Sequence, residues 1–220
     1  MSITTEAHIN LVLPDTPYAL WARGELDDHL GIPHEFTRVE IIGGEIVVSP
    51  APFLEHGGII QDLVKLLVKA ELTNPEFPWE CIQGTGLDLV GLQDGYIPDL
   101  VVLDAEVLPA ARRAKVRYLV PDQVELVVEV TSPSNAANDR RPQRKGAKFN
   151  KWAGYARAEI PYYLLIDRDP KNSQVILYSI QDQGTGAYLH EESWQFGETI
   201  HLPEPFGLEI PTEQWSPWEN

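Results

Sequence analysis

The run Val124–Val130, VELVVEV, constrains the fold more than any other part of this chain. It is a nearly continuous apolar strand with acids only at Glu125 and Glu129, so it should be largely buried. A helix over Gln143–Ala158 and a strand over Tyr162–Asp167 are predicted to follow it. Strand, helix and strand in this order are typical of a crossover unit, which indicates an α/β fold.

Further elements are predicted on both sides of this unit. Two β-rich stretches between Arg38 and Ser49 flank Gly43-Gly44, a hairpin signal because glycine tolerates positive φ. An apolar stripe with helical spacing predicts a helix over Glu55–Leu72. The remaining predictions are a short helix with polar breaks within Tyr18–Leu30 and strands over Trp79–Gln83, Leu87–Val90, Tyr96–Leu103 and Gln174–Ile180. Together they indicate a mixed central sheet flanked by two helices, with extra antiparallel strands.

A length of 220 residues fits one domain, with an N-terminal extension over 1–37, a core over 38–167 and C-terminal strands over 168–220. The single cysteine, Cys81, excludes an intramolecular disulfide and a four-cysteine zinc site. No stretch approaches the roughly 18 apolar residues of a membrane span. We therefore expect a cytoplasmic protein that is neither secreted nor inserted in a membrane.

Two acids stand next to apolar strands. Asp99 directly precedes Leu100–Leu103, and Glu129 follows Val124–Val128. An ionised carboxylate is costly to bury unless a cation or hydrogen-bond donors meet it. At neighbouring strand ends, the two acids would form an oxygen-rich pocket suited to Mg²⁺ or Mn²⁺. The alternative, in which Asp99 caps a turn and Glu129 pairs with an arginine, stays open on these residues alone.

The charge distribution bears on a nucleic-acid substrate. A formal net charge of −16 opposes general affinity for DNA, because phosphate contacts need clustered Lys and Arg. Most basic residues, however, concentrate in two segments, Arg112–Arg117 and Arg140–Lys151. We expect both segments to flank the acidic pocket as a positive rim. A lysine from the second segment would supply the cation that phosphodiester hydrolysis needs beside a metal.

Three ordered pieces carry a family resemblance: IPDLVVLD (97–104), LVVEVTSPSN (126–135) and KWAGYARAEIPYYLLID (151–167). They resemble the Uma-type restriction endonuclease family of the PD-(D/E)XK nuclease superfamily. The upstream run VEIIGGEIVVSPAP, followed by His56, is similar to the N-terminal pattern of that family. The resemblance spans roughly Arg38 to Asp167, and it implies a restriction-endonuclease-like fold and metal-dependent cleavage of DNA.

The resemblance also implies roles for individual residues. Asp99 is the acid of the PD element and Glu129 the acid of the (D/E)XK element, and both would hold the metal. Thr131 stands where the superfamily carries its lysine, and a neutral hydroxyl cannot replace an ammonium. In this family the lysine is relocated to the following helix, four residues before a tyrosine, which selects Lys151 and Tyr155. Residues i and i+4 share a helix face, so these two side chains should point the same way.

The residues by themselves leave the choice of lysine open. On a helical wheel Lys151 lies nearly opposite the apolar face of Phe149 and Trp152, where a lysine would be solvated. Lys148 or Lys145 could reach the acids instead. Weaker candidates for the site are Glu45 and His56, which match the N-terminal pattern, and Thr131 and Tyr155. The residues expected to contact DNA are Arg140, Arg141, Arg144, Lys145 and Lys148.

The predicted function is therefore that of a Mg²⁺-dependent endonuclease acting on DNA. A homodimer is predicted by analogy with nucleases that cut two strands. Two other functions stay open. One is a catalytically inactive binding or assembly module that keeps the fold, as the net charge and Thr131 both suggest. The other is a metal-dependent hydrolase of a small phosphoester, which a resemblance in fold does not exclude.

Overall fold

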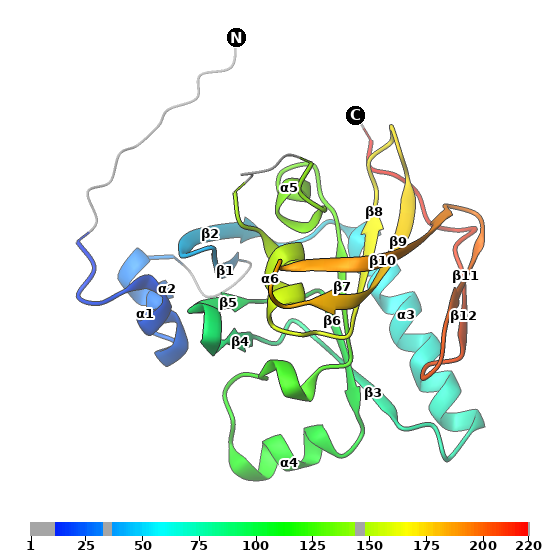
Figure 1. Cartoon of the computed structure of the whole chain (residues 1–220), viewed down its shortest axis with the longest axis horizontal. Coiled ribbons are helices and arrows are strands. Elements are labelled where there is room, and N and C mark those ends of the chain that lie inside the picture. Colours follow the sequence, from blue (N-terminus) through cyan, green and yellow to red (C-terminus); the bar gives the residue numbers. More distant parts are fainter. Residues whose placement is uncertain (1–11, 33–36, 144–147, 220) are drawn as a thin grey trace.

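The computed structural model describes residues 12–32, 37–143 and 148–219, and a six-stranded mixed sheet forms its centre (Figure 1). The strands lie in the order β10-β9-β8-β7-β6-β3. Their bounds are β3 Trp79–Gln83, β6 Leu100–Asp104, β7 Leu126–Val130, β8 Tyr162–Asp167, β9 Gln174–Asp182 and β10 Ala187–Gln195. β7 and β8 are parallel, whereas the other neighbouring pairs are antiparallel. The chain crosses from β7 to β8 through α5 (Ala136–Asp139) and α6 (Lys151–Arg157), which confirms the predicted crossover unit.

A smaller sheet holds the predicted hairpin. Its strands, in the order β2-β1-β5-β4, are β1 Thr37–Ile42, β2 Glu45–Pro50, β4 Leu87–Leu89 and β5 Asp94–Tyr96. Ile42 pairs with Glu45 across Gly43 and Gly44, whose φ angles of 60° and 77° need glycine. The Asp94 carboxylate accepts hydrogen bonds from both glycine N–H groups, at 2.8 and 2.9 Å. The hairpin is confirmed, and its turn is attached to β5.

The single strand predicted over Tyr96–Leu103 is wrong. The chain leaves the small sheet after Tyr96 and enters the central sheet at Leu100. Between them, Pro98 has no N–H to donate to a ladder, so a continuous strand is interrupted there. Asp99 therefore lies where the chain passes from one sheet to the other.

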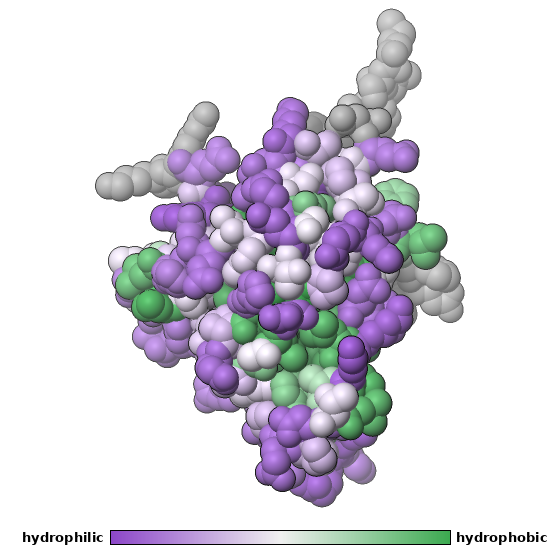
Figure 2. Space-filling view, turned by 90° about the vertical axis from the view of Figure 1, so that its right-hand side faces the viewer, coloured by the Kyte–Doolittle hydropathy of each residue, from purple (hydrophilic) through white to green (hydrophobic). Residues whose placement is uncertain are grey.

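Two apolar layers cover the central sheet (Figure 1). On one face, α3 (Leu54–Thr73) buries Ile59, Ile60 and Leu63 against the sheet, close to the helix predicted over Glu55–Leu72. The hairpin of β11 (Thr199–Leu202) and β12 (Leu208–Pro211) contributes to the same layer. On the other face, α6 packs with Trp152 and Tyr155. Figure 2 shows the side of α3 and β11–β12, where apolar residues are visible in the lower half among hydrophilic ones.

The helix predicted over Gln143–Ala158 is shorter, because α6 begins at Lys151. Asn150 caps it: the side-chain oxygen accepts from Ala153 N at 3.2 Å, and the amide donates to Arg140 O at 2.7 Å. A side chain that accepts from the third residue of a helix stabilises its start. Lys151 thus occupies the first turn rather than the middle of a long helix.

The outer elements also differ in part from the prediction. The helix expected within Tyr18–Leu30 is two helices, α1 (Pro17–Arg23) and α2 (Leu26–Leu30), because Gly24 ends the first one in the left-handed region. α4 (Val107–Ala114) follows β6, and short 3-10 turns lie at Val90–Leu92 and Pro121–Gln123. None of the described helices is both long and apolar enough to cross a membrane.

Candidate active site

A cleft of about 840 Å³ opens at the end of the central sheet where β6 begins and β7 ends. The hairpin, the start of α3, α5, α6 and the C-terminal segment all contribute to its wall. Its polar and charged lining includes Arg38, Glu40, His56, Asp99, Glu129, Asp139, Lys151 and Arg168, and the C-terminal residues Ser216–Glu219 complete one side.

Lys151 stands between two acids inside this cleft. Its Nζ lies 3.0 Å from Oε1 of Glu129 and 2.7 Å from Oε1 of Glu40, and the residue is only 5% exposed. The Tyr155 hydroxyl donates to the same Glu129 oxygen at 2.5 Å. The alternative left open by the helical wheel, a solvated Lys151, is therefore wrong. The predicted approach of Lys151 to Glu129 and the shared direction of Lys151 and Tyr155 are both present.

Close packing of α6 explains this geometry. Gly154 lies against the Tyr96 ring, where an added Cβ would come within 2.1 Å of the Tyr96 hydroxyl oxygen. The absence of a side chain lets the helix approach β5 and the neighbouring β1. Tyr96 is itself held by a 2.9 Å hydrogen bond from its hydroxyl to Asp94. This approach brings the first turn of α6, and with it Lys151, to the end of β7.

Asp99 occupies the matching end of β6. The register of β6 and β7 pairs Leu100 with Val128, so Asp99 and Glu129 lie one position beyond this pair on adjacent strands. The N–H of Val130 donates to Asp99 Oδ2 at 2.8 Å. The two acids therefore meet at one end of the sheet and not at opposite edges. That they share a divalent ion stays a prediction.

Arg38 and His56 also contact Asp99. Nη1 of Arg38 lies 2.5 Å from Asp99 Oδ1, and Nε2 of His56 lies 3.0 Å from the same oxygen. Burial by itself would raise the pKa of Asp99, but these contacts and the N–H of Val130 outweigh it and hold the pKa well below its ordinary value. Asp99 is therefore ionised across the physiological range.

The pKa of Glu129 is shifted in the opposite direction, although Glu129 lies beside Asp99. Burial raises the pKa of Glu129 to about 7, with Asp99 and Glu40 adding to the effect and Lys151 opposing it. Burial and then the charge of Glu129 raise the pKa of Asp139 well above its usual range. Burial would lower the pKa of Lys151, but Glu129 and Glu40 raise it, so the ammonium stays charged.

The donor set fits a divalent ion such as Mg²⁺. Four buried carboxyl groups (Glu40, Asp99, Glu129 and Asp139) line the cleft against two permanently charged partners, Arg38 and Lys151. His56 Nε2 is buried and has no hydrogen bond to the described residues, although Asp99 Oδ1 lies 3.0 Å away. Within the described residues, no three His, Cys, Asp or Glu side chains form a complete ligand set. Mg²⁺ usually takes one or two carboxylates and completes its shell with water and phosphate.

Three other candidates lie elsewhere. Glu45 and Lys148 form an exposed ion pair with each other and do not line the cleft. Thr131 is buried, but its hydroxyl donates to Asp167 at 3.1 Å and accepts from Arg168 N at 2.9 Å, so it joins two strand ends. The structure therefore does not bring Glu45, Lys148 or the Thr131 hydroxyl into the acid cluster.

The predicted positive rim is corrected in part: Lys151 of the segment Arg140–Lys151 lines the cleft, but the other described basic residues of the two segments do not. Arg140 pairs with Asp167 and Asp169, and Arg141 pairs with Glu191. The segment Arg112–Arg117 lies on and after α4. This helix follows β6, at the end of the strand opposite to Asp99 (Figure 1). None of these residues lines the cleft. The remaining two residues expected to contact DNA, Arg144 and Lys145, lie outside the described residues.

Glu40 and Arg38 belong to the cleft but were not among the predicted site residues. They alternate along β1 with Val39 and Ile41, which pack into a separate apolar cluster with α1. The alternation of the run Arg38–Ile42 could have shown that Glu40 points away from Val39 and Ile41. Asp99 and Glu129 are predicted by the same reasoning, because each is an acid next to an apolar run.

Comparison with known proteins agrees with this architecture. A crystal structure described as "a putative nuclease belonging to DUF820", from Anabaena variabilis ATCC 29413, superimposes with a TM-score of 0.58 at 18% sequence identity. The match covers 86% of this chain and 95% of that one, which shows that the two chains share a fold. A search among curated proteins found no match. Residues 26–213 match the family "Uma2: Putative restriction endonuclease", and the chain therefore belongs to the Uma2 family.

Proposed function

We propose that this protein is a metal-dependent endonuclease that hydrolyses phosphodiester bonds in DNA. The observation that carries the proposal is the buried cluster in which Lys151 joins Glu40 and Glu129 while Asp99 lies at the adjacent strand end. A pocket of buried carboxyl groups with one ammonium group matches the needs of phosphodiester hydrolysis, in which a cation must offset developing negative charge.

Asp99 and Glu129 would hold Mg²⁺, and His56 is positioned at the edge of that site. When bound, Mg²⁺ offsets charge on the phosphate and lowers the pKa of the attacking water. In the reaction, the water oxygen forms a bond to phosphorus, the bond from phosphorus to one ester oxygen breaks, and the leaving oxygen gains a proton.

The protein's own groups orient the reactants around this step. Lys151 keeps its charge between Glu40 and Glu129, so it can stabilise negative charge on the phosphate oxygens. The hydroxyl of Tyr155 keeps its proton because burial raises its pKa well above 10, and its hydrogen bond fixes the orientation of Glu129. Arg38 and the N–H of Val130 hold Asp99 in place.

Cleavage of supercoiled plasmid by the purified protein tests the proposal. We expect nicked or linear product with Mg²⁺ or Mn²⁺ and none with EDTA. Asp99→Asn and Glu129→Gln should abolish cleavage, whereas Glu45→Gln should cleave like the unmodified protein because Glu45 lies outside the cleft. Hydrolysis of small phosphoesters without DNA cleavage would instead favour a small-molecule hydrolase. No hydrolysis with a correctly folded protein would favour the inactive binding module.

A further inference from the structure

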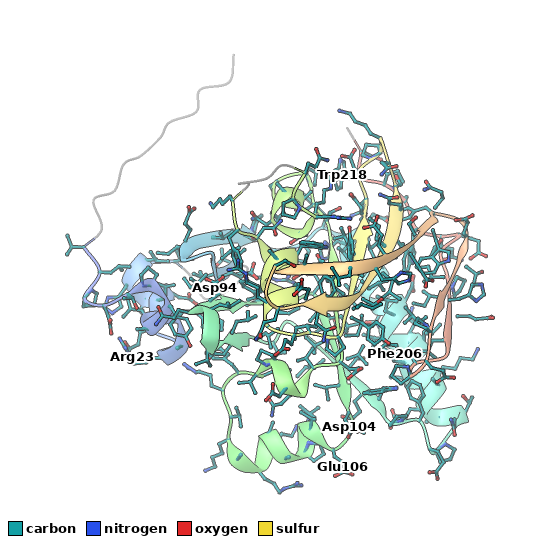
Figure 3. The ribbon with its side chains drawn as sticks, in the orientation of Figure 1. Arg23, Asp94, Asp104, Glu106, Phe206 and Trp218 are labelled. Carbon is teal, nitrogen blue, oxygen red and sulfur yellow. The ribbon has the colours of Figure 1, made fainter. Side chains whose placement is uncertain are left out.

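The C-terminal segment Ser216–Glu219 closes one side of the cleft and is attached to the end of β8. The N–H of Trp218 donates to Arg168 O at 3.0 Å, and Nε of Arg168 donates to Ser216 O at 3.0 Å. Just before this segment, Trp215 is buried in the apolar layer beneath α3. Figure 3 labels Trp218 at the upper end of the sheet, near α5. The segment is therefore a fixed part of the cleft wall.

Arg168 differs from the other charged groups of the cleft. Arg38 and Lys151 each form an ion pair with a carboxylate, whereas Arg168 forms none with the described residues. Burial lowers the pKa of Arg168, and the charge of Glu55, which lines the same cleft, opposes that effect without an ion pair. Arg168 is only 5% exposed. A buried cation without a partner is unfavourable unless an anion or solvent meets it. Arg168 is thus a cation in the cleft that no described carboxylate pairs with directly, so an incoming anion can bind it.

The guanidinium of Arg168 has unused donors. Its only hydrogen bond to described residues runs through Nε, so neither terminal nitrogen has a partner among the described residues. Arg168 lines the cleft. A guanidinium fork matches the geometry of a phosphate group.

The position of Arg168 is tied to the acid cluster. The parallel register of β7 and β8 pairs Val130 with Ile166, so the chain beyond β8 continues beside the chain beyond β7. Thr131 Oγ1 accepts from the N–H of Arg168 at 2.9 Å, two residues after Glu129. Thr131, which stands at the lysine position of the superfamily pattern, thus helps to place an arginine near the same strand ends.

Aromatic rings complete this part of the wall. Trp218 is half-buried and lines the cleft with Phe53, which is 79% exposed at the start of α3. Nucleic-acid bases stack on such rings when they are unpaired, whereas bases inside a duplex have both faces occupied. An arginine for the phosphate and a tryptophan for the base are the two components of a subsite for single strands.

We propose that Arg168 and Trp218 form a nucleotide subsite that binds an unpaired stretch of the nucleic-acid substrate. Arg168 contacts a backbone phosphate, and the Trp218 ring stacks on a base. The inference rests on the proposed nuclease function, and it narrows the substrate from DNA in general to DNA with a single-stranded segment.

Binding experiments without cleavage test the subsite directly. We would measure the affinity of a fluorescently labelled single-stranded DNA oligonucleotide, and of its duplex, in EDTA and in Ca²⁺ at several salt concentrations. Trp218→Ala should weaken single-strand binding by about tenfold or more, with little effect on the duplex. Trp218→Phe should restore most of the loss, because it keeps an aromatic face.

Arg168 has a separate signature in the salt dependence. Arg168→Gln should lower the slope of log affinity against log salt by about 0.7 for a single strand, the loss of one phosphate contact. Arg168→Lys should keep that slope. Arg23→Gln, which removes a surface charge on α1, is the matched control and should leave the slope unchanged. Thermal unfolding of each variant shows whether it is folded.

The outcomes separate the subsite from the nuclease proposal. If single-strand binding depends on Arg168 and Trp218 but no phosphodiester is cut with Mg²⁺, the subsite is right and the nuclease function is wrong. If plasmid is cut but folded Trp218→Ala and Arg168→Gln bind single strands normally, the subsite is wrong. Equal losses for single strand and duplex, or no nucleic-acid binding at all, would also overturn it.

Discussion

Two glutamate–lysine pairs join the same hairpin to the same segment of chain, yet they lie in opposite environments. Lys151 reaches Glu40 of β1 inside the cleft, with side chains 6% and 3% exposed. Lys148 reaches Glu45 at the start of β2 on the surface, with side chains 59% and 61% exposed. We call them the inner pair and the outer pair. The environment of each lysine is therefore set by its burial in the fold, and not by its residue type or its neighbours in the sequence.

The largest expected difference between the pairs is in catalysis. Lys151→Met should lower plasmid cleavage by about 10² to 10³-fold, the usual effect of losing one group that stabilises charge in the transition state. Lys148→Met, measured under the same conditions, should cleave within about twofold of the unmodified protein because its charge is solvated. If Lys148→Met abolishes cleavage and Lys151→Met does not, the assignment of the lysine is wrong.

The next largest expected difference between the two pairs is in their contribution to stability. Lys151→Met leaves Glu40 and Glu129 buried without their cation, so the free energy of unfolding should fall by about 3 to 5 kcal/mol. Lys148→Met should cost less than about 1 kcal/mol. Urea unfolding at pH 8 measures both values. Equal losses in the two variants would show that the inner pair is no more important to the fold than the outer pair.

The pH dependence of stability sharpens the comparison further. Glu129 in the folded, metal-free protein has a pKa of about 7, above the ordinary 4.5, so the folded state binds the extra proton between these values. Its contribution to stability therefore falls as pH rises from about 4.5 to 7 and stays low above that. Glu129→Gln removes the ionisable group and with it this fall in stability.

The free energy of unfolding of Glu129→Gln, relative to the unmodified protein, should therefore rise by roughly 1 to 3 kcal/mol between pH 5 and pH 8. Glu45→Gln should show no such trend, because Glu45 is exposed. The measurement is urea unfolding in EDTA at both pH values. A flat difference for Glu129→Gln would mean that the carboxyl is already ionised at pH 5.

The smallest effect should be the coupling within the outer pair. A double-mutant cycle of Glu45→Gln and Lys148→Gln should give an interaction free energy below about 1 kcal/mol, reduced further by salt. The matching cycle for Glu40→Gln and Lys151→Met should give a larger value that salt changes little. A salt-sensitive inner pair would indicate that water enters the cleft more freely than the burial of Lys151 implies.

Several features of the site could be read from local pattern. Asp99 and Glu129 were recognisable because each adjoins an apolar strand, where an ionised group needs a partner. The parallel crossover, the Gly43-Gly44 hairpin and the helix of α3 followed from periodicity and turn residues. By contrast, the strand Tyr96–Leu103 and the helix Gln143–Ala158 were predicted too long. Pro98 was a local signal against the continuous strand, whereas the Asn150 cap depends on contact with Arg140.

Local pattern in the sequence therefore located the buried strands and the two acids at their ends, and the family resemblance selected Lys151. The residue pattern left Lys148 open, and only the folded chain showed that Lys151 is the buried lysine, that Glu40 joins it, and that Arg168 has no ion pair with a described residue. The physical reason is that apolar periodicity reports the burial of a strand or helix face along the chain. Which cation meets which carboxylate depends on contacts between segments far apart in sequence, such as the close approach of Gly154 to Tyr96.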